Sequence, residues 1–253
     1  MRNLFWCFLV ASGSLYAAGH GPVFGLATPT NPAGGWSLDL SQMFRAAPNG
    51  FGSMLRAEIG YGITQDLKVA LSGPAVFAAE PLPPARMSAF TPMGGDFEAL
   101  ALWRFHRQDL GVGKRFESTV IAGLIAPGPQ RTAGPGPGFY TAAVTGFASR
   151  SNYVWTGGGY QRYRDGTGMV TYSAVYGYRP QSWRTDYPRW DWRVFGEMTG
   201  EVVQSRSSTH QVFVGPSTLG VYRNYAISFG FQLPAHRESR ERFRMAINLA
   251  YFF

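Results

Sequence analysis

Charged side chains recur at alternate positions within otherwise apolar stretches of this 253-residue sequence. Both signs occur, so these groups could pair as ions in an interior or could line a polar path for a solute. Nine of them are candidates for such an interior lining: Asp39, Arg56, Glu58, Lys68, Glu98, Arg104, Arg193, Glu197 and Arg244. Arg56, Glu58, Arg193 and Glu197 are the leading candidates, whether the charges select a solute or only stabilise a nearly closed interior.

The charges lie on segments of about ten residues in which apolar and polar side chains alternate. In the last segment, every second residue from Phe243 to Phe253 is apolar, whereas the positions between them hold Arg244, Asn248 or alanine. A period of two indicates a β-strand with two different faces. Similar segments, separated by turn residues, follow one another from residue 36, and their number predicts an all-β chain of about twelve antiparallel strands.

The position of the charges indicates which face points inward. In a soluble sandwich or lipocalin-like barrel the apolar face is the core, whereas in an outer-membrane barrel it meets lipid and the polar face lines the lumen. Charges such as Glu58, Lys68 and Glu197 lie in mid-strand, with glycines on the same face. Aromatic residues such as Trp36 and Tyr225 lie near strand ends, as at membrane interfaces. We therefore expect a transmembrane antiparallel β-barrel of about 12 strands.

The lengths of the connections agree with this orientation. If both termini are periplasmic, the two longest connections, 77–94 and 126–138, lie outside, and short turns such as 64–66 and 150–152 lie on the periplasmic side. Long outer loops and short periplasmic turns are typical of these barrels. The connection around 180–188 is longer than this asymmetry predicts.

The N-terminus resembles a secretory signal, with Arg2 before an apolar run and small residues after it. We expect cleavage after Ala17, a leader or lumen plug over 18–35, and a barrel over 36–253. A mature chain beginning Ala18-Gly19-His20 could bind Cu(II) or Ni(II) through its amine, two amides and the imidazole. His20 is therefore a speculative metal ligand, and no cofactor is expected otherwise. The triple glycine at 157–159 indicates a kink or the close approach of a lumen-filling chain.

The remaining histidines give little support for catalysis. His106, His210 and His236 are far apart in sequence and have no acidic residue at triad or ligand spacing. An outer-membrane phospholipase would need a serine within hydrogen-bond reach of a histidine on the outer face, and no such pair is identified. We expect that the protein is not an enzyme.

Two hairpins carry a resemblance to a known family. YGITQDLKV at residues 61–69, followed by LSGP at 71–74, resembles a hairpin of the outer-membrane family named after the MetA pathway of phenol degradation. VGPS at 214–217 and FQLP at 231–234 resemble the penultimate hairpin of that family, and Glu197 lies where it tends to carry an inward acidic residue. The resemblance extends from residue 36 to 253 and is patchy in the middle. It implies a transporter barrel for small, hydrophobic or aromatic molecules, and no catalytic residues.

The expected function is passage of small solutes across the bacterial outer membrane without chemistry. The alternative is an occluded barrel that acts as a binding or accessory component, linked to a metal through His20. The expected partners are outer-membrane lipid and lipopolysaccharide, the solute, and the barrel assembly machinery, which would read the terminal Phe253; nucleic acid is not expected. Arginines around 179–193 are expected on the outer surface, against lipid phosphates: Arg179, Arg184, Arg189 and Arg193.

Overall fold

The computed structural model describes residues 21–47, 50–79, 85–88, 91–93, 96–127, 137–183, 189–204, 209–235 and 241–253. The expected signal peptide over 1–17, its cleavage site, His20, Arg184 and His236 lie outside these ranges, so those expectations stay predictions.

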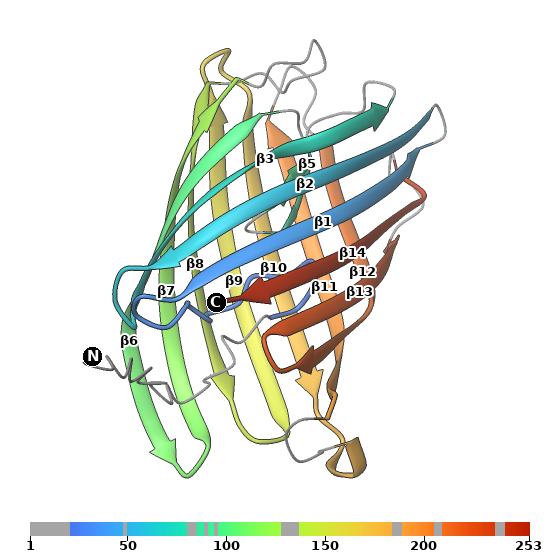
Figure 1. Cartoon of the computed structure of the whole chain (residues 1–253). Coiled ribbons are helices and arrows are strands. Elements are labelled where there is room, and N and C mark those ends of the chain that lie inside the picture. The colour runs from blue at the N-terminus through green and yellow to red at the C-terminus, as the bar shows by residue number, and fades with distance from the viewer. Residues whose placement is uncertain are drawn as a thin grey trace, which may run out of the picture.

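Twelve antiparallel strands form one closed barrel (Figure 1). In chain order they are β1 (Trp36–Ala47), β2 (Gly50–Gly62), β3 (Leu67–Ala79), β6 (Phe97–Gly111), β7 (Lys114–Ala126), β8 (Gly138–Ala148), β9 (Asn152–Tyr163), β10 (Gly168–Tyr178), β11 (Asp191–Gln204), β12 (Thr209–Tyr222), β13 (Tyr225–Pro234) and β14 (Phe243–Phe252). Each strand pairs with its neighbours in sequence order, and β1 closes the sheet by pairing with β14. The predicted fold class and strand number are therefore confirmed.

Two short elements lie in the connections. β4 (Ala85–Ser88) and β5 (Thr91–Met93) form a hairpin between β3 and β6, and the 3₁₀ turn η1 (Gln181–Trp183) follows β10. Within the described ranges, no helix is long and apolar enough to cross a membrane.

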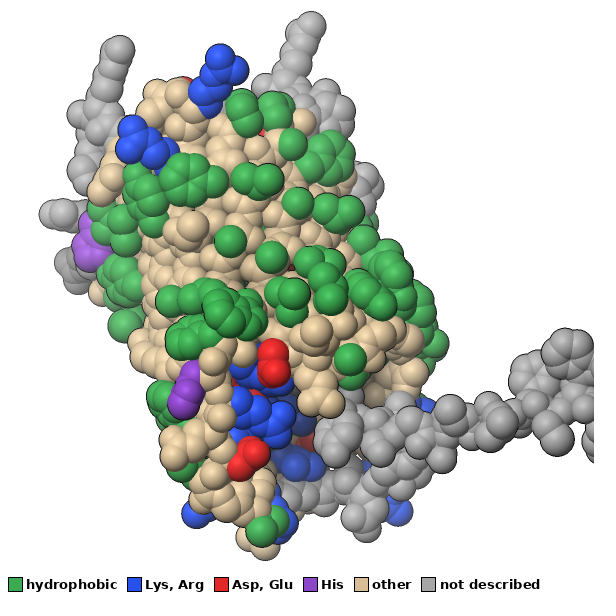
Figure 2. Space-filling model, turned by 90° about the vertical axis from the view of Figure 1, so that its left-hand side faces the viewer, with side chains coloured by type: hydrophobic (Ala, Val, Ile, Leu, Met, Phe, Trp, Pro, Cys, Tyr) green, Lys and Arg blue, Asp and Glu red, His purple; other side chains and the backbone are tan. Residues whose placement is uncertain are grey.

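The strands expose apolar side chains outward and bury polar ones inward. Leu71, Leu124 and Leu249 are between 52% and 70% exposed on the outer face, whereas Glu197 and Arg244, at alternating positions, are almost completely buried. The residues of the last strand that would form the core of a soluble protein thus face outward. Figure 2 shows hydrophobic side chains spread over the visible wall of the barrel, with charged ones gathered below them.

Aromatic side chains mark both ends of this apolar wall. At the end that carries the C-terminus, the ring of Trp36 contacts those of Tyr61 and Phe253, and the rings of Tyr225 and Tyr251 lie 4.9 Å apart. Further rings lie toward the opposite end of the strands: Phe44, Phe51, Phe139, Tyr160, Phe231 and Phe243. Along β14 the two sets are eight residues apart, roughly 26 Å at the usual rise, close to the height of the apolar band in outer-membrane barrels.

The two ends of the barrel differ in the length of their connections. The end with the C-terminus, here called the proximal end, has short turns after β2, β6, β8 and β12, and one longer connection after β10. The opposite, distal end has the longest connection, 80–96 after β3, and the connection 127–137 after β7. The four short proximal turns follow the asymmetry expected from the sequence, whereas the proximal connection after β10, 179–190, does not, because it is one residue longer than that after β7.

Candidate functional site

Residues 21–31 lie inside the barrel, and they are called the inserted segment below. The segment folds back on itself, because a Cβ at Gly21 would lie 2.5 Å from that of Ala27. At its tip, Val23 and Phe24 are buried against inward-facing residues of β1, β2 and β14, including Met43 and Met54. The sequence left a leader and a plug as alternatives over 18–35, and residues 21–31 of this stretch lie against the inner wall of the barrel.

Glu197, in the middle of β11, holds the tip of the segment. Its carboxylate accepts hydrogen bonds from the backbone N–H groups of Val23, Phe24 and Gly25, at 2.8, 2.8 and 2.6 Å. It also accepts one from the hydroxyl of Ser217 on β12. A carboxylate is the natural partner for three converging N–H groups, and bonds to an ionised acceptor are the strong ones. The inward acidic residue noted in the sequence thus binds a part of the same chain.

Thr28 provides the second attachment. Its hydroxyl donates to Oε2 of Glu117 at 3.0 Å and accepts from the indole N–H of Trp155 at 3.1 Å. Its carbonyl accepts from the hydroxyl of Thr119 at 3.2 Å. Three residues of β7 and β9 therefore hold one threonine, and side chains rather than sheet pairing fix the segment at this point.

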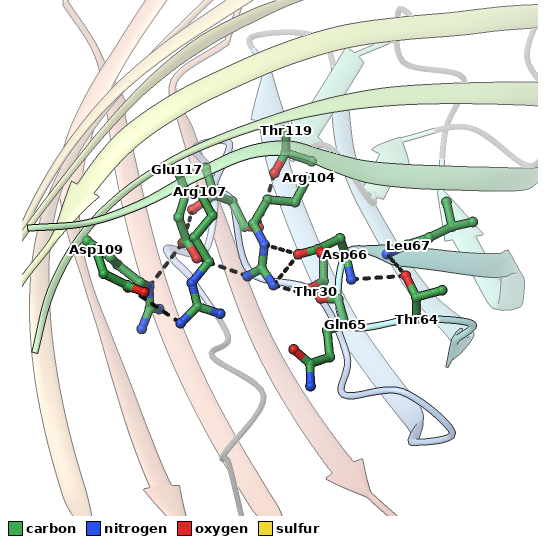
Figure 3. Close-up of polar contacts among 12 residues, drawn as sticks. Thr30, Thr64, Gln65, Asp66, Leu67, Arg104, Arg107, Asp109, Glu117 and Thr119 are labelled. Carbon is green, nitrogen blue, oxygen red and sulfur yellow. Dashed lines mark hydrogen bonds and ion pairs between the residues drawn. The ribbon is translucent and has the colours of Figure 1, made fainter.

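A charged cluster at the proximal end supports this attachment (Figure 3). Arg104 on β6 donates to Glu117 at 2.9 Å and to Asp66, in the turn after β2, at 2.8 Å. A bulge after Arg104 shifts the alternation of β6, so that Arg107 is paired with inward-facing Glu117 in the register. Arg104 also donates to the carbonyl of Gln65, which accepts a bond from the hydroxyl of Thr30 in the inserted segment.

The first glycine of the triple glycine lies against the inserted segment. A Cβ at Gly157 would be 3.0 Å from Cδ1 of Leu26 and 2.6 Å from the carbonyl oxygen of Ala143. The expected close approach of a lumen-filling chain is therefore present at this position. It brings Leu26 to β9 and β10, where its N–H donates to Ser173 at 3.0 Å.

The wall of the lumen has two different sides. On β9 and β11, Tyr153, Trp155 and Phe195 point inward and form an aromatic cluster, with ring centroids 5.6 to 6.3 Å apart. On β1 to β3, Asp39 faces Glu58 directly across the register, and Glu58 pairs with Lys68 at 3.2 Å.

A third group of charges lies in the distal half. Arg244 on β14 binds Glu201 on β11 and Glu241, which precedes β14, and Arg45 on β1 also binds Glu241. The guanidinium of Arg244 lies 3.8 Å from the ring centroid of Phe213. Burial would raise the pKa of Glu241, but Arg244 and Arg45 outweigh it and lower that pKa to about 2. The network links the neighbouring strands β1 and β14 to β11, which is not adjacent to either of them in the sheet.

The nine predicted lining residues therefore do not form one site. Asp39, Glu58 and Lys68 lie together, and Arg56 is close by, since its guanidinium donates to Ser72 and to the carbonyl of Asp96. The other five lie elsewhere on the inner wall: Glu98 opposite Ser72, Arg104 at the proximal end, Arg193 beside Asp191, Glu197 at the inserted segment and Arg244 in the distal network.

One expectation is wrong. Arg179 and Arg193 do not form an outer basic surface, because both bind Asp191, at 2.6 and 3.1 Å. Arg193 lies at an inward-facing position of β11, and Arg179 directly follows the end of β10. Arg193 also lies 5.5 Å from the ring centroid of inward-facing Tyr153. Asp191, two residues before Arg193 and therefore on the same face of the strand, could have indicated the pairing with Arg193 from the sequence.

A cavity of about 110 Å³ remains between the inserted segment and the barrel wall. Its charged side is formed by Asp39, Arg56, Glu58 and Lys68. The wall continues from β1 to β14, β13 and β12, which contribute polar Ser228 and Asn248 besides apolar Leu219, Ala226, Ala250 and Phe252, and the inserted segment contributes Val23 and Ala27 among others. The part of the lumen left open by the segment is thus lined by charged, polar and apolar side chains.

Comparison with known proteins identifies the fold. No family model and no curated protein matches the sequence. Among solved structures, an outer membrane channel from Pseudomonas putida F1 is 11% identical, with a TM-score of 0.56 over 88% of this chain and 97% of that one. The NanC porin is 8% identical, with a TM-score of 0.53 over 85% and 98% of the two chains. The chain therefore has the fold of the twelve-stranded outer-membrane β-barrels.

Proposed function

We propose that this protein passes small solutes through its lumen across a bacterial outer membrane, and that the inserted segment controls access to that lumen. The observation that carries the proposal is the way in which the segment is held. Glu197, Ser173, Thr119 and Glu117 bind it through side chains. Its withdrawal would therefore leave the hydrogen bonds between the strands of the barrel intact.

The two-sided lumen supports a solute that is partly apolar. Tyr153, Trp155 and Phe195 are covered by the inserted segment and by one another, and withdrawal of the segment would open this aromatic cluster to a hydrophobic or aromatic molecule. Offset or tilted ring contacts contribute about 0.5–1.5 kcal/mol beyond burial. The resemblance to the MetA-pathway phenol degradation family agrees with such a solute. No chemistry and no cofactor form part of this proposal, and outer-membrane lipid, lipopolysaccharide and the assembly machinery are its proposed partners.

Conductance in planar bilayers tests the proposal. The full chain and a variant that lacks residues 21–31 would be purified as folded barrels and compared at equal protein density. We expect rare or small openings from the full chain and a steady, larger conductance from the deletion variant. A deletion variant that keeps its β-barrel circular dichroism and never conducts would contradict solute passage.

The alternative, an occluded barrel with a binding or accessory role, is favoured by one specific observation. The tip of the segment is buried together with Met43, Met54 and Ala246, in addition to its bonds to Glu197. If the full chain never opens under any voltage or solute, this alternative is preferred. A metal link through His20 would then be tested by mass spectrometry of the mature N-terminus, since a chain that begins at Gly19 cannot form that site.

A further inference from the structure

We propose that the inserted segment occupies the binding site of the solute, and that this site takes a primary amine with an aromatic or apolar body. The ammonium group would bind the carboxylate of Glu197, and the body would lie over Val175 against Trp155. The proposal rests on the proposed function, because it names the class of solute that would enter when the segment withdraws. It depends on the charge of Glu197, on the donors that now satisfy it, and on the side chains beside it.

Glu197 is a buried carboxylate without a counter-ion. It is 3% exposed, and within the described ranges the groups that bind it are all neutral: the backbone N–H groups of residues 23–25 and the hydroxyl of Ser217. Other inward carboxylates differ, since Glu117 and Glu201 each pair with an arginine. A buried charge is normally paired. The place that the segment occupies therefore has a negative charge and no cation of its own.

Withdrawal of the segment removes three of the four donors that satisfy this carboxylate. Oε1 accepts from the N–H of Val23 and from the hydroxyl of Ser217. Oε2 accepts from the N–H groups of Phe24 and Gly25. A primary ammonium group has three N–H donors and no acceptor, and hydrogen bonds between ionised partners are stronger than those to a neutral donor. An amine thus supplies the donors that the segment supplies, and the missing positive charge in addition.

The body of the amine has a defined place beside Glu197. In the register, Glu197 on β11 is opposite Val175 on β10, and Val175 is opposite Trp155 on β9. Phe195 precedes Glu197 by two residues on the same face, and its ring centroid is 6.2 Å from that of Trp155. Strands β9 and β11 are two strand spacings apart, roughly 10 Å. An amine joined to an aromatic ring by a two-carbon linker can therefore contact the carboxylate and the ring cluster together.

The inserted segment follows the same path across the wall. The Cβ that Gly25 lacks would lie 2.2 Å from Cγ2 of Val175, so the backbone lies directly on that side chain. Leu26 then belongs to the same cluster of buried residues as Trp155 and Phe195. A donor at Glu197 followed by an apolar group at the ring cluster is the arrangement of the bound segment. An amine of this kind would therefore compete with it.

Calorimetric titration in detergent, at low salt, tests the site with three probes of similar size: phenethylammonium, 3-phenylpropionate and 2-phenylethanol. The full chain and the variant that lacks residues 21–31 would both be titrated. We expect phenethylammonium to bind to the deletion variant about tenfold or more tightly than the other two probes do, since a hydrogen bond between charged groups is formed. It should bind to the full chain more weakly, because the segment competes and reduces the competent fraction. In the deletion variant, Glu197→Gln should weaken its binding about tenfold or more.

A second measurement needs no deletion. In the full chain with Cys7→Ser and Ala27→Cys, phenethylammonium should speed the reaction of the buried position 27 with a maleimide, because bound amine keeps the segment withdrawn. 2-Phenylethanol should not. An amine that binds without speeding this reaction would overturn the proposal, since it would bind elsewhere.

Glu201→Gln in the deletion variant is the matched control, since it removes an inward carboxylate of the same strand that already pairs with Arg244. It should leave the binding of phenethylammonium nearly unchanged. Equal weakening by Glu197→Gln and Glu201→Gln, or equal binding of phenethylammonium and 3-phenylpropionate, would overturn the site. Conductance of the deletion variant without binding of the amine contradicts the amine site alone, whereas binding without conductance contradicts solute passage alone.

Discussion

Replacing Glu197 by glutamine tests the attachment of the inserted segment most directly. The carboxylate accepts three backbone N–H bonds of 2.6 to 2.8 Å from Val23, Phe24 and Gly25. A hydrogen bond to a charged group contributes about 1.5–3 kcal/mol. Glutamine keeps one acceptor oxygen but is neutral and turns an N–H₂ group toward backbone donors. We therefore expect the inserted state to lose about 3 kcal/mol, a shift of roughly 100-fold toward withdrawal.

The shift toward withdrawal of the segment can be measured without a conductance recording. A single cysteine at the buried position Ala27, in a chain whose Cys7 is replaced by serine, reports withdrawal through its rate of reaction with a maleimide. In Glu197→Gln this rate should rise roughly 100-fold, in line with the free energy above. Single-channel recordings should show a higher open probability in the same variant.

Glu201→Gln is the matched control, because Glu201 lies inward on the same strand but pairs with Arg244. Its labelling rate should stay close to that of the parent chain. A labelling rate that is unchanged in Glu197→Gln, or that rises equally in both variants, would refute the assignment of Glu197 as the group that retains the segment.

Four further predictions concern other parts of the barrel. Trp155→Phe removes the indole N–H bond to Thr28; the loss of about 1 kcal/mol should raise labelling at position 27 about fivefold, and an unchanged rate would contradict this role. Arg244→Met removes the cation that two buried carboxylates, Glu201 and Glu241, share and should lower the free energy of unfolding, measured by urea titration in lipid vesicles, by about 3–5 kcal/mol; stability equal to that of the parent would show that Arg244 contributes nothing. Leu249→Arg places a charge on the outward wall, where Leu249 is 52% exposed, and the same titration should show a loss of about 2–4 kcal/mol; no loss would mean that this wall does not meet lipid. Because the pKa of Glu241 is lowered to about 2, its contribution to stability is present above the unfolded value near 4.3 and is lost as the pH falls through 2. Protection factors for hydrogen exchange of the backbone from Glu241 into β14, corrected for the intrinsic exchange rate at each pH, should therefore be equal at pH 7 and 5, and a lower protection factor already at pH 5 would contradict the ion pairs.

The sequence predicted the strands because lipid imposes a simple rule on them. Leu249 and Arg244 belong to opposite faces of one strand, and a barrel in lipid turns the apolar face outward and the charged face toward the lumen. The outward aromatics at strand ends, such as Trp36 and Tyr225, follow from the same rule. Closure between β1 and β14 is required too, since an open edge would leave backbone groups unpaired in lipid.

The side chains that line the lumen were harder to predict from the sequence. The alternation of apolar and polar residues shows which face points inward only where the two faces of a strand differ in polarity. Tyr153, Trp155 and Phe195 are as apolar as outward residues, yet they point inward, where the inserted segment and one another cover them. The pairing of inward charges was also out of reach. Glu117 meets Arg104 from the next strand and Thr28 from the segment, contacts that depend on strand register and on a bulge.

The inserted segment shows why an uncharged stretch without strand pattern can still have a defined place. Residues 21–31 contain no charged side chain, so their entry into the lumen costs little desolvation beyond that of the backbone. The backbone cost is met where the barrel offers acceptors, at Glu197 and Ser173, and where Gly157 leaves space for Leu26. A carboxylate buried in a lumen needs donors, and a buried backbone N–H needs an acceptor. Because the barrel and the segment each satisfy the other's buried polar groups, withdrawal of the segment must expose Glu197 to water or to a solute that can donate hydrogen bonds to it.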